Sequence, residues 1–549
     1  MTSPAQESQT DAIVVGAGFA GLYQLIRLRE MGLSTVVLER GPQVGGTWYW
    51  NRYPGARCDI TSLDYSYSFD EDLQQEWEWS EKFATQPEIL RYAEHVAERY
   101  DLNKDIRFGR AVTSALWDET RNVWTVTATA ADEAGTPIPD APVERYAAKY
   151  LILAVGNLSA THMPDIPGIS DFQGRSFHSA HWPKQGVEFS GRRVGVIGTG
   201  STGIQIIPLV AQEAGHLTVF HRTPNFSLPA GNRPLDPEEV AARKSDYSAY
   251  RERARHSFTG VPVPVPTRSV FDVSEEERER VFEEAWNSGV YGALLASFTD
   301  LSTDAEANEL AAEFIRRKVR SLTKDPDLAR VLEPRGNYFG TKRTCLDTNY
   351  YQTFNRDNVT LVDLKAEPIV RITPKGVETQ GREVELDDLI FATGFDAMTG
   401  SLLAINPVGL GGRSLQDAWK EGPYTFLGVA SHGFPNLFFI TGPGSPSVLS
   451  NMIVSIEQHV DWVTALIRAM SDRGVDAFQP TAQAEREWMQ TVHDEAAKTL
   501  YLSGNSWYLG ANVPGKPRVF MPYVAGVGQY RAIADEEAAA GYPHWVPAA

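Results

Sequence analysis

The chain has 549 residues, of which 42% are hydrophobic, and its 51 basic and 70 acidic residues give a formal net charge of −19. This length suggests roughly three to four domain-sized units, and the acidic excess argues against a nucleic-acid-binding protein, which would carry a basic surface. The two cysteines, Cys58 and Cys345, are too few for a disulfide framework, a thiolate zinc cage or an iron–sulfur cluster.

Residues 1–10 are polar and lack a signal-peptide pattern. Nowhere does an apolar run approach the roughly 20 residues that span a bilayer. We therefore expect a soluble, cytoplasmic protein with no membrane or nucleic-acid partner, and the sequence is compatible with a monomer.

Strand-like and helix-like segments alternate in the first third of the chain. A short apolar run at 13–15 precedes glycines and a helix-like segment over 22–31, and a second strand-like run follows at 35–38. The continuous apolar run at 150–155 is typical of a strand that is buried on both faces of a parallel sheet.

The same pattern starts again at residue 194. A strand-like run at 194–197 is followed by glycines, a helix-like stretch and a second strand-like run at 217–220. Acidic, helix-like sequence with little strand signal fills about 236–332. Strand-like runs return afterwards, at 359–362, 389–391 and 437–440.

A glycine motif lies at the first strand-to-helix turn, in the sequence Gly16-Ala17-Gly18-Phe19-Ala20-Gly21. In a dinucleotide site the first glycine permits a tight turn, the second lets the backbone approach a pyrophosphate, and the third allows close helix–strand packing. Glu39 lies eighteen residues beyond Gly21, where a carboxylate can accept hydrogen bonds from a ribose 2′-OH. An ordinary strand–turn–helix connection is the alternative, but strand, glycines, helix and acid follow one another as a dinucleotide site requires.

A second glycine motif follows the strand at 194–197, in the sequence Gly198-Thr199-Gly200-Ser201-Thr202-Gly203. Nineteen residues beyond Gly203, where the first unit has its acid, this unit has Arg222 followed by Thr223. A guanidinium pairs with a 2′-phosphate that a carboxylate would repel, although a surface arginine at a strand end is the alternative. The contrast predicts FAD at the first site, with Gly16, Gly18, Gly21 and Glu39, and NADPH at the second, with Gly198, Gly200, Ser201, Gly203, Arg222 and Thr223.

These motifs predict an α/β fold with two Rossmann-like dinucleotide-binding domains, for FAD and NADP, and a helical insertion. The first domain is discontinuous, because strand signals return after the insertion. The expected boundaries are 1–160 for the first part of the FAD-binding domain, 161–223 for the first part of the NADP-binding domain, 224–334 for the insertion, 335–388 for the second part of the NADP-binding domain, and 389–549 for the second part of the FAD-binding domain.

A further motif lies between the two glycine motifs, in the sequence Phe172-Gln173-Gly174-Arg175-Ser176-Phe177-His178-Ser179-Ala180-His181-Trp182-Pro183. It resembles the FxGxxxHxxxWP fingerprint of type I Baeyer–Villiger monooxygenases at every defined position: Phe172, Gly174, His178, Trp182 and Pro183. The segment 46–59, with Thr47 and Trp48, resembles a second family signature. The resemblance runs from about residue 11 to about residue 542. It is closest to the phenylacetone and steroid monooxygenase branch, through the segments 340–343, 442–447 and 507–512.

The resemblance implies an NADPH- and FAD-dependent monooxygenase that converts a ketone to an ester or lactone. In such enzymes NADPH reduces FAD, and O2 then forms a peroxide at the flavin C4a carbon. The deprotonated peroxide attacks the ketone, and a carbon group migrates to oxygen. The protein supplies orientation, charge and exclusion of water.

The resemblance also assigns two catalytic residues. Arg343 would stabilise the anion, since an arginine stays protonated, and Asp59 would orient Arg343. Without the family, Lys342 and Arg343 would more often be a solvated basic pair, and Asp59 a turn or capping carboxylate.

Further roles follow from the same resemblance. Lys342 would join Arg222 and Thr223 around the 2′-phosphate, and Gln205 and Trp507 would contact NADP, with Trp507 on a mobile loop near 503–518. Other members of the cofactor set would be Thr47, Trp48, Asp59 and Arg343. His178 would couple the nicotinamide and flavin steps, although alone it would read as a hydrogen-bonded linker histidine. The segment with Val448, Leu449 and Met452 would form a wall of the substrate pocket, for which ordinary core is the alternative.

Two rival functions remain open at this point. A heteroatom-oxidising (N- or S-) flavin monooxygenase would share the cofactors, but Trp182-Pro183 and Arg343 argue against it. A non-catalytic dinucleotide-binding redox sensor would share only the two nucleotide sites. No spaced cluster of His, Cys, Asp and Glu suggests a metal.

Overall fold

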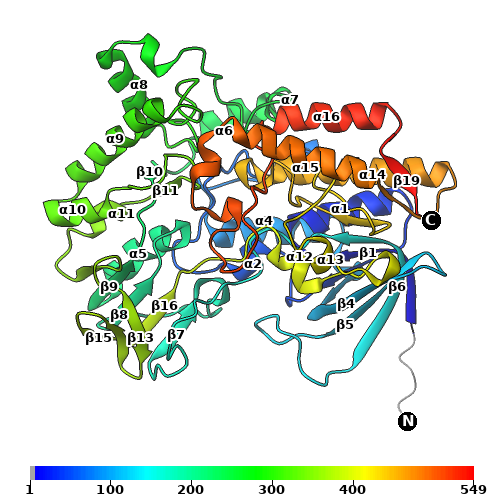
Figure 1. The fold of residues 1–549 in the computed structure, drawn as a ribbon, viewed down its shortest axis with the longest axis horizontal. Helices are drawn as coiled ribbons and strands as arrows, with labels where there is room; N and C mark the ends of the chain where they lie inside the picture. Colours follow the sequence, from blue (N-terminus) through cyan, green and yellow to red (C-terminus); the bar gives the residue numbers. More distant parts are fainter. Residues whose placement is uncertain (1–6, 549) are drawn as a thin grey trace.

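The structure of the chain is a computed structural model that describes residues 7–548. The first six residues of the polar N-terminal segment lie outside the described residues, as does residue 549. Figure 1 shows two sheets side by side, with helices from the C-terminal third lying next to the N-terminal helix α1. Both ends of the described chain therefore belong to the unit that holds the first glycine motif.

The first sheet has seven strands with a parallel middle. Its order is β3-β2-β1-β6-β5-β4, with β17 beside the end of β6; β5 runs antiparallel to its neighbours β4 and β6, and the other strand pairs are parallel. The predicted run at 13–15 is at most 7% exposed, because apolar clusters cover both faces of the sheet. The strands are β1 (Glu7–Val15), β2 (Thr35–Glu39), β3 (Ile106–Phe108), β4 (Arg110–Asp118), β5 (Val123–Ala130), β6 (Val143–Leu153) and β17 (Leu437–Phe439).

Helices from both ends of the chain cover this sheet. On one face, α1 packs against α14, and α14 packs against α16. The other face is covered by the shorter α12 and α13. The elements of this unit outside the sheet are α1 (Phe19–Glu30), α2 (Thr47–Trp50), α3 (Glu71–Glu76), α4 (Gln86–Arg99), α12 (Gly400–Ile405), α13 (Leu415–Ala418), α14 (Met452–Asp472), α15 (Ala482–Ala497), α16 (Val527–Ala539), β18 (Phe478–Pro480) and β19 (Trp545–Pro547).

The second sheet has five parallel strands in the order β12-β9-β8-β16-β7. Apolar clusters again cover both faces. The elements of this unit are β7 (Arg175–His178), β8 (Arg193–Ile197), α5 (Ser201–Glu213), β9 (His216–His221), α11 (Tyr350–Thr353), β12 (Val359–Asp363), the meander β13 (Ile369–Thr373), β14 (Gly376–Thr379) and β15 (Glu383–Glu385), and β16 (Asp388–Phe391).

Strand β16 shifts one expected boundary. It pairs with β8 and β7 along its whole length, and the buried carboxylate of Asp388 at its start bonds Arg175 and Arg192. The boundary expected between 388 and 389 therefore falls inside a strand of the second sheet. The chain returns to the first unit only after Phe391.

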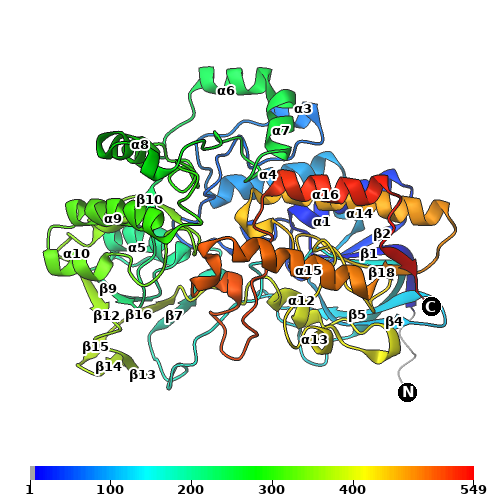
Figure 2. The same ribbon diagram turned by 45° about the horizontal axis from the view of Figure 1, so that its top comes forward.

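The helical insertion divides between the two units. In Figure 2, α6 and α7 lie beside α3, whereas α8, α9 and α10 lie beside the second unit. Arg251 of α7 is 3% exposed and donates to the backbone oxygen of Asp64 and to Ser66 Oγ of the first unit. The elements of the insertion are β10 (Ser227–Pro229), α6 (Pro237–Ser245), α7 (Tyr247–Arg255), α8 (Glu275–Asn287), α9 (Ala305–Leu322) and α10 (Pro326–Leu332). Strand β10 pairs with β11 (Cys345–Asp347), which follows the insertion. Within residues 7–548, none of the helices combines the length and apolar composition needed to cross a bilayer.

Candidate functional site

A cavity of about 1770 Å³ lies between the two sheets and is lined by both glycine motifs. A pocket for one small ligand typically has about 300–1,000 Å³. Besides the glycines, the cavity lining includes Glu39, Arg222, Asp59 and Arg343. The fold therefore brings both predicted nucleotide sites and the predicted catalytic pair to one space.

The two motifs occupy equivalent places in the two sheets. Gly16 follows β1 and has φ +102°, and a Cβ added to it would lie 2.6 Å from the backbone oxygen of Ala154, which follows β6. Gly198 follows β8 and has φ +111°, and its added Cβ would lie 2.4 Å from the backbone oxygen of Ala392, which follows β16. Only glycine fits such a turn. Both turns thus lie at the carboxyl ends of parallel strands, where open α/β sheets bind ligands.

The third glycine of each motif packs the helix onto its strand. An added Cβ at Gly21 would lie 1.8 Å from the backbone oxygen of Gly16, and one at Gly203 would lie 2.2 Å from that of Gly198. Neither Gly21 nor Gly203 is among the cavity-lining residues of the described chain, as the packing role requires.

The N-termini of α1 and α5 leave room for a phosphate. Their N-cap residues, Gly18 and Gly200, have no side chain to bond the first-turn N–H groups, and neither helix has an acidic residue in its first turn. The helices α3, α8, α9, α14 and α15, by contrast, are capped by a side-chain oxygen. Free N–H groups facing a cavity at a helix N-terminus form an anion site. The residues present therefore fit two bound pyrophosphates.

Glu39 is held in place at the first site. Its carboxylate is 5% exposed and accepts hydrogen bonds from the backbone N–H groups of Ala17, at 2.7 Å, and Gly41, at 2.6 Å. Burial raises the pKa of Glu39, and the two backbone donors oppose that shift. Each oxygen keeps a further lone pair for a ribose hydroxyl. Next to it, Thr47 and Trp48 of α2 also line the cavity.

Three cations gather at the second site. Arg222, Lys342 and Lys365 line the cavity along with Thr223. Burial and then the positive charges of Arg222 and Lys365 lower the pKa of Lys342. Across the described residues, no carboxylate forms an ion pair with any of the three. Uncompensated cations at this position fit a 2′-phosphate.

Lys365 was not among the predicted site residues. It follows the strand β12, which neighbours β9 and so ends near Arg222. The sequence could have indicated it only if the strand-like run at 359–362 were placed beside the one at 217–220, because Lys365 lies far along the chain from the glycine motif.

Arg343 and Asp59 form a two-point ion pair in the cavity. The guanidinium donates from Nε and Nη2 to the two Asp59 oxygens, each at 2.8 Å, and from Nη1 to the backbone oxygen of Val448 at 2.6 Å. Burial disfavours the charged form, but the Asp59 carboxylate outweighs it and holds the pKa of Arg343 well above its usual value. A fixed cation in a partly dry cavity can stabilise negative charge on oxygen.

The predicted pocket wall is brought to the cavity only in part. Val448 and Met452 line it, whereas Leu449 packs, partly buried, against the apolar cluster behind it. Leu449 and Val448 belong to a short 3-10 turn, Ser447–Leu449, so their side chains point in different directions. Trp507 lines the same cavity.

The segment 503–518 is held against the site by several contacts. Asn512 donates to the backbone oxygen of Phe395 at 2.8 Å, and Lys516 donates to that of Ala397 at 2.9 Å. Within the segment, Arg518 donates to the backbone oxygen of Gly504 at 2.8 Å. Ser506 is 4% exposed, lines the cavity, and its Oγ has no protein partner within the described chain. The segment therefore packs at the cavity, and its motion stays a prediction.

Gln205 bridges the two units. Its Nε2 donates to the backbone oxygen of Arg57 at 3.0 Å, and its Oε1 accepts from the Tyr53 hydroxyl at 2.9 Å. It lines the cavity, as does Ser201, whose Oγ contacts Cys345 Sγ at 3.2 Å. A contact of Gln205 with NADP therefore has to compete with this bridge.

The fingerprint lies behind the cavity wall. His178 is 8% exposed, and its Nδ1 accepts a hydrogen bond from the backbone N–H of Ala180 at 3.2 Å. The ring proton is therefore on Nε2, which lies 3.4 Å from Thr393 Oγ1. Thr393 itself lines the cavity. Burial lowers the pKa of His178 to about 4. His178 therefore connects β7 to the segment that leaves β16, as an interdomain role requires.

The other fingerprint residues pack. Trp182 is 4% exposed and contacts Phe177 and Phe189. Phe172 packs against the cluster on one face of the second sheet, and an added Cβ at Gly174 would lie 2.5 Å from the Phe172 ring. The backbone oxygen of Pro183 accepts from Gly186 at 3.1 Å.

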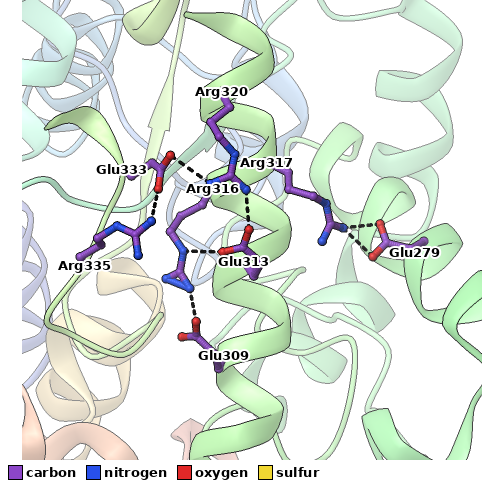
Figure 3. A network of polar contacts seen from close by, with 8 residues as sticks. All are labelled: Glu279, Glu309, Glu313, Arg316, Arg317, Arg320, Glu333 and Arg335. Carbon is purple, nitrogen blue, oxygen red and sulfur yellow. Dashed lines mark hydrogen bonds and ion pairs between the residues drawn. The ribbon is translucent and has the colours of Figure 1, made fainter. Parts of the chain in front are cut away.

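An ion-pair network in the insertion reaches the cavity wall (Figure 3). Arg320 of α9 pairs with Glu313 and with Glu333, which is 2% exposed, and Glu333 also pairs with Arg335. Arg335 lines the cavity, eight residues before Arg343. The network thus connects α9 to the segment that carries Arg343. Arg316 joins it through Glu313 and also pairs with Glu309, whereas Arg317 and Glu279 form a separate pair beside it.

Comparison with known proteins agrees with this geometry. The family model described as pyridine nucleotide-disulphide oxidoreductase matches residues 13–232. A Baeyer–Villiger monooxygenase of Pseudooceanicola batsensis is 43% identical over 95% of this chain and 93% of its own length. A phenazine N-monooxygenase of Lysobacter antibioticus is 40% identical over 98% of this chain and 96% of its own.

A solved steroid monooxygenase bound to NADP is 47% identical, with a TM-score of 0.92, and the match covers 98% of this chain and 99% of that one. Another solved relative, seen in two crystal forms with both FAD and NADP, is 41% identical, with a TM-score of 0.93, and the match covers 99% of this chain and 100% of that one.

Proposed function

The chain belongs to the Baeyer–Villiger monooxygenases, a family of enzymes that use FAD and NADPH, and from that premise we propose that it inserts one oxygen atom of O2 next to the carbonyl of a neutral, apolar ketone to give an ester or lactone. The observation that supports this proposal is the Arg343–Asp59 pair, which lies in the cavity that joins the two nucleotide sites. A binding protein would need the glycines and Arg222, but not a buried cation between the two sites.

The two coenzymes, when bound, supply reducing electrons and the activation of O2. On this chain, α1 with Gly18 and Glu39 would hold FAD, and α5 with Gly200 and the Arg222–Lys342 pair would hold NADPH. The high pKa of Arg343 keeps its charge at neutral pH, so it can stabilise negative charge on oxygen without giving up a proton. Asp59 and the Val448 backbone oxygen fix its orientation.

The substrate class follows from the lining. Val448, Met452 and Ile456 line the cavity, and the backbone oxygen of Val448 bonds Arg343. We therefore propose a ketone whose substituents are hydrocarbon.

A second candidate is N-oxygenation of an aromatic heterocycle. The phenazine N-monooxygenase, at 40% identity over 98% of this chain, favours keeping it. It would use the same coenzymes and the same cavity.

One experiment separates the candidates. The purified holoenzyme is incubated with NADPH, O2 and a panel of linear, cyclic, aryl and steroid ketones, with phenazine included, and the products are identified by mass spectrometry. Ester or lactone from at least one ketone supports the proposal. Oxidation of phenazine alone would favour the second candidate, and NADPH oxidation that no panel member accelerates would contradict both.

A further inference from the structure

Arg343 has a third neighbour that comes from the helical insertion. The carbon centre of its guanidinium lies 4.4 Å from the centroid of the Tyr291 ring, within the range of a cation–π contact. Tyr291 lies in the connection between α8 and α9, and its partly buried ring packs against both the first unit's core and the insertion's own core.

The base of this connection is anchored. Lys82 of the first unit donates to the backbone oxygen of Ser288 at 2.8 Å. Gly289 has φ +58°, and an added Cβ there would lie 2.0 Å from the backbone oxygen of Ala230, so the chain is tightly enclosed just before Tyr291. The position of the Tyr291 ring is therefore determined by packing on both sides.

The three contacts of Arg343 have different physical effects. Asp59 holds one edge of the guanidinium and compensates its charge, while the Val448 oxygen holds another donor. An aromatic face attracts the cation through its quadrupole and carries no net charge. It can therefore fix the plane of the guanidinium without neutralising it.

We propose that Tyr291 is a positioning residue for Arg343, through which the helical insertion fixes the plane of the catalytic cation. The ring face acts, and the hydroxyl is dispensable. The inference rests on the proposed function, because its main consequence is seen in ketone oxygenation. Burial raises the pKa of Tyr291, so its phenol is neutral at working pH.

Three variants test it: Tyr291→Leu, which removes the ring; Tyr291→Phe, which keeps the face; and Phe298→Leu, which removes a ring from the insertion core away from Arg343. In Tyr291→Leu the ester formed per NADPH consumed should fall roughly 5- to 30-fold, the range for a buried cation–π contact. Tyr291→Phe and Phe298→Leu should stay within about twofold of the parent. The proposal would be overturned if Tyr291→Leu formed as much ester per NADPH consumed as the parent, or if Tyr291→Phe lost as much of this ratio as Tyr291→Leu.

Two further measurements keep the test decisive. If Tyr291→Leu does not fold, phenylalanines carrying one, two or five ring fluorines are placed at position 291, since fluorine weakens the ring quadrupole at nearly constant shape. The ester formed per NADPH consumed should then fall with each added fluorine. A ratio that did not change along the series would contradict the role of the ring in positioning Arg343.

Crystal structures of Tyr291→Phe and of the Leu or pentafluoro variant give a readout that does not depend on activity. The guanidinium should keep its bond to the Val448 oxygen in the first and lose it in the second. Should the parent make no ester, the proposed function fails, while the same pair of structures still decides whether Tyr291 positions Arg343.

Discussion

The carboxylate of Asp59 accepts two hydrogen bonds from the guanidinium of Arg343, one from Nε and one from Nη2, each 2.8 Å long. The two residues lie 284 positions apart in the sequence. A bidentate pair fixes both the distance and the plane of the arginine, so the geometry of the cation depends on contacts between the two units of the fold.

Arg222→Ala should weaken NADPH binding roughly 10- to 150-fold, the cost of one charge-assisted phosphate contact. NADH binding should change little, because NADH lacks the 2′-phosphate. Dissociation constants for NADP⁺ and NAD⁺ measure the difference. Arg356→Ala is the control, because it removes an exposed side chain that, within residues 7–548, bonds only Asn358. Equal losses for both coenzymes would contradict the assignment.

Gly200→Ala and Gly203→Ala should fail in different ways. A Cβ at Gly200 meets nothing within 4 Å, so the variant should fold and bind FAD, but the methyl group should block the pyrophosphate and lower NADPH affinity by about 10-fold or more. At Gly203 the added Cβ would lie 2.2 Å from the backbone oxygen of Gly198, so that variant should lose about 1–3 kcal/mol of stability. Calorimetry measures NADPH binding by Gly200→Ala, and thermal unfolding measures the stability of Gly203→Ala. If Gly203→Ala were only weakly destabilised, Gly203 would not be needed to pack the helix onto its strand.

Met452→Ala should change the ratio of kcat/KM for bulky ketones to kcat/KM for small ketones by about 10-fold, as expected when a pocket gains the volume of a few methylene groups. Leu449→Ala should change it little, because Met452 lines the cavity and Leu449 does not. Reduction of the flavin by NADPH should stay near the parent rate in both. Competition assays with paired ketones measure the ranking, and an unchanged ranking in Met452→Ala would remove this helix start from the pocket.

His178 should make the protein less stable in acid. Burial lowers its pKa to about 4 from an ordinary value near 6.5, so between these values the unfolded chain binds a proton that the folded chain does not. The stabilising contribution is fully present above about pH 6.5 and is lost as the pH falls toward 4, at a cost of about 1–3 kcal/mol. His178→Gln should reduce the proton uptake on unfolding measured in this window; an unchanged uptake would show that the ring is not buried and neutral.

The sequence predicts the two nucleotide sites because their determinants are local. Gly16, Gly18 and Glu39 are within a single strand–helix–strand unit, and the same holds for Gly198, Gly200 and Arg222. The structure places all six on the cavity. The expected strands are confirmed where a continuous apolar run marks a parallel strand buried on both faces, as at 150–155, which β6 covers through Leu153.

Other features depend on tertiary contacts and left no local signal. The antiparallel strands β4 and β5 alternate apolar residues with threonine and other polar residues, a pattern weaker than a continuous run. Lys365 and Tyr291 reach the site from a strand end and from an insertion connection that the chain alone does not place. Arg343, Asp59 and the pocket wall with Leu449 were expected only from the family resemblance. The resemblance does not reveal which side chain of the short turn at Ser447–Leu449 points inward.

The central claim is that Arg343, held by Asp59, is required for ketone oxygenation. Arg343→Ala should still bind FAD, because Gly18 and Glu39 are unchanged, and NADPH should still reduce the flavin. Loss of one preorganised charge partner costs about 2.7–4 kcal/mol in comparable oxyanion sites, so ester formation should fall by roughly 100- to 1,000-fold. NADPH consumption that remains should produce hydrogen peroxide. Asp59→Ala should change the products in the same direction, but less completely.

The most direct measurement is a single-turnover experiment in which pre-reduced enzyme is mixed with O2 and an accepted ketone, and ester and hydrogen peroxide are quantified for the parent and for Arg343→Ala. The account predicts ester as the main product of the parent and hydrogen peroxide as the main product of the variant. Ester formation by Arg343→Ala at close to the parent rate would contradict it.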